Sequence, residues 1–211
     1  GNTSLRTRAC FRAAGLEAEF WDPLTGRIVP ARAEQNPEGT VALSLEFEPY
    51  QSMVLVFSHQ PARDGAAEPP AVSLPEAIDL SRDWDLAFTG TGRRVRLDRL
   101  RSWTEDPETR FYSGPATYER TVAVNPGWLS AGIAWYLEFG QGAPLPEVPS
   151  SQPGMRAWLD APVRDAAMVY VNGARAGSAW CPPYRVEITP HLRPGENAIR
   201  VVVGNLAMNR M

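Results

Sequence analysis

The chain has 211 residues with 24 acidic and 21 basic side chains, a formal net charge of −3, and a hydrophobic content of 44%. This balance favours a packed core over a disordered chain, and no apolar run approaches the ~20 residues of a membrane-spanning helix. All 21 basic residues are arginines, which excludes lysine-dependent chemistry such as Schiff bases and Walker-type phosphate loops.

The densest group of basic side chains does not indicate a nucleic-acid partner. Binding to phosphates requires a concentrated basic face. The mostly alternate spacing of these arginines is instead typical of the solvent side of a strand. They are Arg93, Arg94, Arg96, Arg99 and Arg101. We therefore expect neither nucleic acid nor a membrane as a partner.

Cys10 and Cys181 are the only two cysteines, too few for a thiolate zinc site. A disulfide between them would join opposite ends of the chain. Two buried, inert thiols are the simpler interpretation.

The chain is divided into short segments by 20 prolines and 17 glycines, and no long stretch has a helical apolar period. This pattern predicts an all-β fold. Residues 1–59 form the first block, with a hairpin of strands at 18–21 and 27–29 and further strands at 41–47 and 53–57. About 60 residues is small for a self-sufficient sandwich, so we expect this block to complete, or pack on, another domain.

Residues 60–72 are polar and proline-rich, which predicts a linker. Residues 73–211 then fit one β-sandwich. Asn172-Gly173 is the strongest hairpin signal in the chain, and residues 194–197 predict a turn. The strands of this sandwich are expected at 84–88, 95–100, 116–124, 134–139, 166–171, 185–188 and 198–203.

Three segments carry a resemblance to a known family: SGPATYE at 113–119, VYVNG at 169–173, and WCPPYRVEIT at 180–189, which continues to Asn197. Together they resemble the C-terminal galactose-binding-like sandwich of large bacterial glycoside hydrolases. The sugar-binding domain of family 2 is a relative, and the family 106 α-L-rhamnosidases are most similar. AEFWDPLTG at 18–26 and SMVLVFS at 52–58 resemble the small β-domain that follows the catalytic barrel in those enzymes.

This resemblance implies a jelly-roll sandwich preceded by a smaller β-domain, in a non-catalytic accessory region of a glycoside hydrolase that acts on a plant-type polysaccharide. The catalytic carboxylates would belong to a barrel domain of the same polypeptide, which is the expected partner. A secreted or periplasmic bacterial protein is implied as well. No cofactor is expected. A structural calcium is common on this fold, and Asp83 and Asp85 could bind one, although solvation at a strand edge is the alternative.

No catalytic residues are predicted in the chain itself. Glycoside hydrolysis needs two carboxylates about 5 to 10 Å apart, and the densest acidic cluster, Glu105, Asp106 and Glu108, is expected to be a solvated turn. Neither His59 nor His191 has a serine in a nucleophile-elbow motif as a partner. A small self-contained glycosidase is therefore the least favoured of the alternatives.

Aromatic residues in turn-rich segments are the candidate site. Flat rings bind the apolar face of a sugar, while neighbouring polar side chains bind its hydroxyls. The same rings could instead dock another domain or belong to the core, and sugar contact would make the chain a free-standing carbohydrate-binding module. The candidates are Trp103, Arg110, Tyr112, Asn172, Trp180, Tyr184 and Arg185. Trp21, Trp84, Trp135 and Trp158 are assigned to the core or a domain interface.

Overall fold

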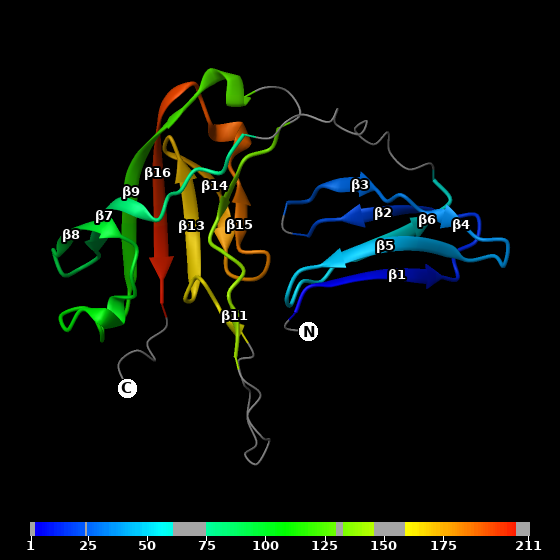
Figure 1. Cartoon of the computed structure of the whole chain (residues 1–211), viewed down its shortest axis with the longest axis horizontal. Helices are drawn as coiled ribbons and strands as arrows, with labels where there is room; N and C mark the ends of the chain where they lie inside the picture. Colours follow the sequence, from blue (N-terminus) through cyan, green and yellow to red (C-terminus); the bar gives the residue numbers. More distant parts are fainter. Residues whose placement is uncertain (1–2, 24, 61–74, 130–132, 146–158, 206–211) are drawn as a thin grey trace, which may run out of the picture. The chain divides into compact units, whose positions relative to one another are not determined.

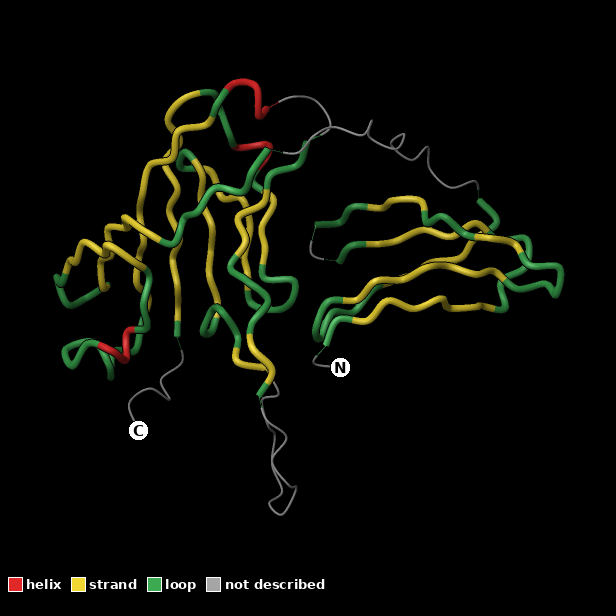
Figure 2. Tube along the Cα trace, in the orientation of Figure 1, coloured by secondary structure: helices red, strands yellow, loops and turns green. Residues whose placement is uncertain are grey.

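The computed structural model describes residues 3–23, 25–60, 75–129, 133–145 and 159–205. The chain divides into two compact units, Gly1–Val72 and Ser73–Met211, and both are built from antiparallel strands (Figures 1 and 2). The predicted all-β class is confirmed: the described residues contain three short 3₁₀ helices and no α-helix. No helix in these ranges is both long and apolar enough to cross a membrane. Most of the predicted linker, from residue 61 onward, lies outside the described residues.

The first unit contains two three-stranded sheets. One has the order β1-β5-β4 and the other β3-β2-β6. The central strand of each sheet pairs with one neighbour that is close in sequence and one that is distant, so each sheet combines a local hairpin with long-range pairing. The strands are β1 (Leu5–Phe11), β2 (Glu17–Trp21), β3 (Ile28–Pro30), β4 (Glu34–Gln35), β5 (Val41–Phe47) and β6 (Val54–Ser58).

The first unit has an apolar core of its own. Val41, Leu43 and Leu45 of β5 are buried in it, and the ring centroids of Phe11 (β1) and Phe57 (β6) lie 5.1 Å apart. Strand β5 has the bounds that alternation predicts, because one of its faces is continuously apolar. The expectation that this block completes, or packs on, another domain stays a prediction.

Strand β1 was not predicted, and it corrects the interpretation of Cys10. Its burial alternates, with Thr7, Ala9 and Phe11 the less exposed residues. Successive side chains of a strand point to opposite faces, so Cys10 falls on the other face and is exposed as a free thiol. The expected burial of Cys10 is wrong, whereas Cys181 is half-buried and also free.

The second unit is built on a six-stranded antiparallel sheet with the order β14-β13-β16-β9-β7-β8. A two-stranded sheet, β10-β15, and a short pair, β11-β12, complete it. Strand β14 and the short pair were not predicted. The strands are β7 (Arg82–Phe88), β8 (Arg94–Arg99), β9 (Pro115–Val124), β10 (Tyr136–Glu138), β11 (Ala143–Pro144), β12 (Leu159–Asp160), β13 (Ala166–Val171), β14 (Ala174–Ala179), β15 (Arg185–Glu187) and β16 (Gly195–Gly204).

The core of the second unit joins the large and small sheets. Val169 and Val201 of the large sheet are buried in one cluster with Leu137 of β10 and Val186 of β15. This two-sheet core is the sandwich that the alternating segments predicted. Trp84 is buried in it at 4% exposure.

The other tryptophans assigned from sequence are placed differently. Trp135 packs against the same core and its indole Nε1 donates to the Trp128 carbonyl at 2.8 Å. Trp21 is 43% exposed, so it does not belong to the core of its unit. It is the last residue of β2, and its indole Nε1 donates to a Glu19 carboxylate oxygen at 3.1 Å. Trp158 lies outside the described residues.

The predicted turn at 194–197 is only partly correct, because β16 already begins at Gly195. Asn197 is fully buried and its Nδ2 donates to the carbonyls of Arg193 and Gly195 at 2.7 and 2.9 Å. Its Oδ1 accepts from the Arg193 backbone N–H and from Asn172 Nδ2. A polar residue that looked like a turn signal is therefore a buried hydrogen-bonding centre.

Candidate functional site

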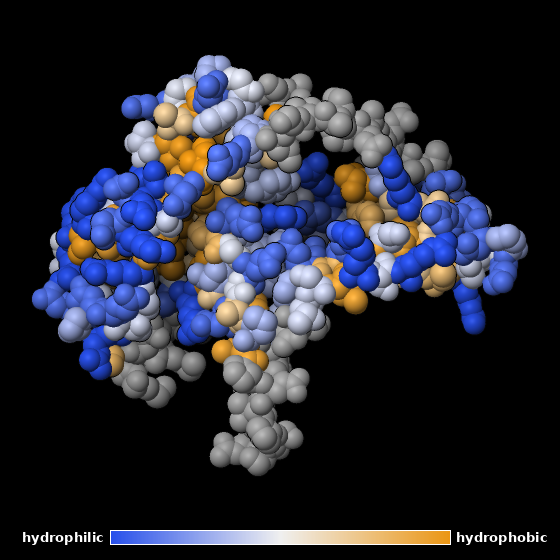
Figure 3. Space-filling view, viewed as in Figure 1, coloured by the Kyte–Doolittle hydropathy of each residue, from blue (hydrophilic) through white to orange (hydrophobic). Residues whose placement is uncertain are grey.

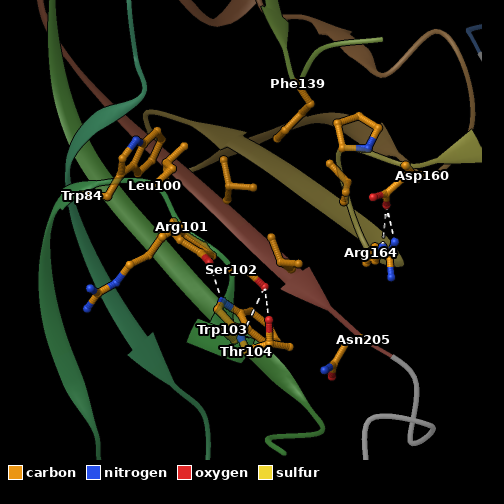
Figure 4. Close-up of a pocket in the computed structure, with 16 residues that line it drawn as sticks. Trp84, Leu100, Arg101, Ser102, Trp103, Thr104, Phe139, Asp160, Arg164 and Asn205 are labelled. Carbon is orange, nitrogen blue, oxygen red and sulfur yellow. Dashed lines mark hydrogen bonds and ion pairs between the residues drawn. The ribbon is translucent and has the colours of Figure 1, made fainter. Parts of the chain in front are cut away.

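A groove of about 660 Å³ lies on the six-stranded sheet of the second unit, within the usual size range of ligand sites. Its floor includes Val201 and Val203 of β16. Figure 4 shows Leu100 to Thr104, after β8, on one side of this strand and Phe139 with Asp160 and Arg164 on the other. Trp84 and Tyr118 also line the groove.

The first wall is held by a capped 3₁₀ helix, η1 (Trp103–Glu105). The Ser102 hydroxyl accepts from the Thr104 backbone N–H at 3.3 Å, and a Glu105 carboxylate oxygen accepts from the Ser102 backbone N–H at 3.1 Å. This reciprocal cap fixes the start of the helix. It thereby positions Trp103, whose ring makes edge contacts with Phe88 at 5.4 Å and Tyr112 at 5.7 Å between centroids.

Trp103 and Tyr118 share a short hydrogen bond beside the groove. The indole Nε1 of Trp103 donates to the Tyr118 hydroxyl at 2.6 Å, so the Tyr118 proton must be donated elsewhere. No acceptor for it is found among the described residues. Burial raises the pKa of Tyr118 above its usual 10.0, against the smaller opposite effect of the Trp103 hydrogen bond. The hydroxyl therefore stays protonated and remains a donor.

An ion pair forms part of the second wall. Arg164 Nε donates to Asp160 Oδ1 at 3.0 Å, and Arg164 Nη2 pairs with the same oxygen. Asp160 Oδ2 and Arg164 Nη1 have no partner among the described residues. Asp160 is the one carboxylate among the described residues that line the groove. The lining residues that the structure describes thus do not include the two carboxylates that glycoside hydrolysis uses.

Two of the predicted site residues support the segment that follows η1. The Tyr112 hydroxyl lies 3.0 Å from the Thr89 carbonyl and 2.7 Å from that of Pro115, and burial raises its pKa. Arg110 places its guanidinium carbon 4.5 Å from the centroid of the Phe111 ring. Neither Tyr112 nor Arg110 lines the groove.

Asn172 stabilises the hairpin between β13 and β14. Its φ of 52° and that of Gly173 at 83° are the positive values that a two-residue type I′ turn needs. Its Nδ2 donates to the His191 carbonyl at 2.9 Å, and its Oδ1 accepts from the Ala198 backbone N–H at 3.1 Å. These bonds give Asn172 a structural role in the turn.

Tyr184, which was expected to contact a sugar or another domain, is only 7% exposed. So little exposed surface contradicts that expectation, and desolvation raises the pKa of Tyr184. Its carbonyl accepts from the Phe139 backbone N–H at 2.9 Å. The sequence around Tyr184 is typical of an exposed turn and contains a cis Pro182-Pro183 bond. It therefore did not indicate that the ring is buried.

Trp180 and Arg185 lie on the surface. Trp180 is 59% exposed. The Arg185 guanidinium carbon lies 5.3 Å from the centroid of the Tyr136 ring, and Tyr136 is 43% exposed. Because Leu137 and Val186 face the core, alternation places Tyr136 and Arg185 on the outer face of β10-β15. Apolar side chains show between polar ones on the surface in Figure 3.

The acidic cluster is not a solvated turn throughout. Arg93 Nη2 binds Asp106 Oδ2 at 2.7 Å, with both side chains mostly covered, and Arg93 also pairs with Glu108. The turn folds back onto the β7-β8 hairpin, which neither sequence segment indicates by itself. Since Glu105 caps η1, all three carboxylates have structural roles.

The predicted calcium ligands are only partly available. Asp85 accepts from Arg96 at 2.7 Å, and Asp83 has a φ of 61°. The described residues contain no group of three or more His, Cys, Asp or Glu placed to hold a metal. A structural calcium stays a prediction.

The groove brings together one predicted site residue, Trp103, and several that sequence reasoning missed: Ser102, Tyr118, Asp160, Arg164 and Asn205. Tyr118 was placed in the predicted strand 116–124, where an aromatic residue is usually interpreted as part of the core. Asp160 and Arg164 are spaced i, i+4 outside any helix, which gives no recognisable signal. The groove is lined by segments spread along the chain from Trp84 to Asn205, and only the fold brings them together.

Comparisons with known proteins relate the chain to glycoside hydrolases. No protein-family model matches it. A protein described as a "putative beta-glucuronidase" from Formosa agariphila is 30% identical over 144 residues, which is 66% of this chain and 11% of that protein. The structure of a rhamnosidase from Novosphingobium sp. PP1Y superposes with a TM-score of 0.75 at 26% identity, over 99% of this chain and 18% of that one.

The chain thus spans between a tenth and a fifth of the length of these two relatives. It is a glycoside hydrolase-related region with a β-sandwich fold.

Proposed function

We propose that this chain is a non-catalytic accessory region of a larger glycoside hydrolase, which it stabilises by packing against the catalytic domain. The observation that carries the proposal is the asymmetry of coverage: 99% of this chain superposes on 18% of a rhamnosidase chain. In a polypeptide of that length, most of the residues lie outside this region, and the catalytic domain among them could pack against it. A rhamnose-containing plant polysaccharide as the substrate, and a secreted or periplasmic location, are predictions of the sequence resemblance.

The groove supports a non-catalytic role. Retaining and inverting glycosidases both need an acid and a second carboxylate across the scissile bond. Asp160 has no second carboxylate among the described groove residues, and Arg164 already binds one of its oxygens. A self-contained glycosidase is therefore disfavoured.

The outer face of β10-β15 and the adjoining Trp180 form the docking surface in this proposal. Trp180 and Tyr136 expose large apolar rings, and Arg185 lies over the Tyr136 ring. Aromatic and arginine side chains are the residues enriched where proteins dock, because they combine a large contact area with a polar end.

The test is Trp180→Ala, made both in the 211-residue chain and in the longer polypeptide. In the isolated chain the ring is 59% exposed, so the melting temperature should change by no more than about 2 °C. In the longer polypeptide the same change should lower melting temperature and glycosidase activity together.

Tyr184→Ala is the matched control, since that ring is only 7% exposed in this chain. Removing it should cost about 3 kcal/mol of unfolding free energy in both proteins. If Trp180→Ala leaves the longer polypeptide as stable and as active as the parent, Trp180 does not dock the catalytic domain and the bracing role is wrong.

A further inference from the structure

The Asn-Gly pair at the tip of the β13-β14 hairpin has a reactivity that its role as a turn does not use. Asn172 is half-buried and Gly173 is exposed. An asparagine followed by glycine readily loses its side-chain amide, because glycine has no Cβ to obstruct the approach of its backbone nitrogen. The pair is therefore a candidate modification site as well as a turn.

The reaction joins two neighbouring groups of the chain, and water is its only other reactant. The backbone nitrogen of Gly173 forms a bond to Cγ of Asn172, the Cγ–Nδ2 bond breaks, and ammonia leaves with the proton of the Gly173 N–H. Water then opens the resulting succinimide at either of its carbonyl carbons, which leaves aspartate or isoaspartate at position 172. An amide with two N–H donors is thereby exchanged for a carboxylate with none.

In the folded chain, three hydrogen bonds hold the Asn172 carboxamide. Its Nδ2 donates to the His191 carbonyl at 2.9 Å and to Asn197 Oδ1 at 2.8 Å, and its Oδ1 accepts from the Ala198 backbone N–H at 3.1 Å. The Asn172 backbone N–H also donates to the Ala198 carbonyl at 2.8 Å. Because the three side-chain bonds fix one rigid plane, the carboxamide must leave them before Cγ can turn toward the Gly173 nitrogen.

Deamidation would also remove donors that the sandwich needs. Asn197 is fully buried, and its Oδ1 accepts from both Asn172 Nδ2 and the Arg193 backbone N–H. Its Nδ2 donates to the carbonyls of Arg193 and Gly195, so the Asn197 amide cannot turn over without losing those bonds. A carboxylate at position 172 would set an acceptor against the Asn197 oxygen and the His191 carbonyl.

Isoaspartate would disturb the turn as well. The φ values of Asn172 and Gly173, 52° and 83°, fit a two-residue type I′ hairpin. Isoaspartate passes the backbone through the side-chain carbon and so lengthens the turn by one atom. The pairing of β13 with β14 could then not keep this turn geometry.

We propose that Asn172 is a deamidation site that the native sandwich protects and that unfolding makes reactive. A chain that deamidates while unfolded cannot recover the contact between Asn172 and Asn197 when it refolds. The modification therefore converts a reversible unfolding into a lasting loss of stability. This proposal does not depend on the bracing role, because all the contacts that carry it lie within the second unit.

Peptide mapping by mass spectrometry tests the proposal on the 211-residue chain, kept at pH 8 either folded or unfolded in guanidinium chloride. Trypsin cleaves after arginine, so residues 165–175 are released as one peptide in which Asn172 is the only asparagine. This peptide should deamidate about 100-fold faster in the unfolded chain than in the folded one, as expected when three hydrogen bonds must first break.

A second peptide of the same digest is an internal control. Trypsin does not cleave before Pro194, so residues 186–200 are released together and contain Asn197 followed by Ala198. The alanine Cβ obstructs the backbone nitrogen that would attack. In the unfolded chain, this peptide should deamidate much more slowly than the peptide that contains Asn172.

A matched pair of variants tests the consequence for stability. Asn172→Asp reproduces one product and keeps a residue type that tolerates a positive φ, and it should lower the melting temperature by about 5 °C. Asn125→Asp makes the same change in the same unit, at a side chain whose Oδ1 accepts from the Gly127 backbone N–H at 2.9 Å. A carboxylate oxygen accepts that bond equally well, so this variant should melt like the parent.

Equal deamidation rates of Asn172 in the folded and the unfolded chain overturn the proposal, because the hydrogen bonds then protect nothing. An unfolded chain in which Asn172 reacts no faster than Asn197 overturns it too. So does an Asn172→Asp variant that melts at the same temperature as Asn125→Asp.

Discussion

Tyr184 and Trp180 belong to one short segment of sequence, yet the first is 7% exposed and the second 59%. Both were expected to contact a partner, because each is an aromatic residue in a proline-rich turn. Burial of a turn residue depends on what packs over it, and the local sequence does not show this. Residue type and local context therefore could not distinguish the exposed ring of Trp180 from the buried ring of Tyr184.

The two cysteines should differ in reactivity toward a thiol reagent such as Ellman's reagent. Cys10 is exposed and Cys181 half-buried, and burial raises the pKa of the Cys181 thiol above its usual 9.0. Because the thiolate is the nucleophile, a higher pKa leaves less of it at pH 8, and Cys181 should react more slowly.

The measurement is the time course of reagent release at pH 8 under native conditions. It should show one fast and one slow thiol, and Cys10→Ser should remove the fast phase while Cys181→Ser removes the slow one. Two thiols that react at one rate would contradict the assignment of Cys10 to the outer face of β1.

At the level of elements, the sequence located most long strands and the hairpin at Asn172-Gly173. The predicted segments 41–47 and 166–171 coincide with β5 and β13, because each has a buried face of apolar residues at alternate positions. Strand β14 was missed because its sequence ARAGSA has no β-branched or aromatic residue. It forms because β13 supplies a partner edge.

The small residues of β14 allow the close approach of β15. A Cβ added at Gly177 would lie 2.8 Å from Val186 Cγ1, and Val186 is a buried, β-branched residue with little freedom to move. Gly177→Ala should therefore lower the free energy of unfolding by about 1 to 3 kcal/mol, measured by chemical denaturation.

Gly204→Ala is the control, as it also changes a strand glycine but meets no atom within 4 Å. It should leave stability unchanged or raise it by about 0.5 kcal/mol, since alanine restricts the unfolded chain more than glycine does. Equal effects of the two substitutions would mean that β14 and β15 do not pack as closely as described.

At the scale of the whole molecule, the all-β class followed from composition and alternation, but the groove did not. Its walls come from residues 100–104 and 160–164, and its floor from β16. No local pattern relates segments so far apart, and their polar residues are unremarkable where they stand in the sequence. Trp103 was identified because an aromatic residue in a predicted turn is a recognisable candidate. Asp160 and Arg164 become candidates only once the structure shows that they form an ion pair in the groove.

The central claim is that this region belongs to a glycoside hydrolase without performing the hydrolysis. The most direct measurement is the release of chromophore from an aryl α-L-rhamnoside and an aryl β-D-glucuronide by the purified 211-residue chain. Among its described lining residues the groove has a single carboxylate, already bound by Arg164, which predicts no release above the buffer rate at any chain concentration. Release that rises in proportion to the chain and is abolished by Asp160→Asn would contradict the account.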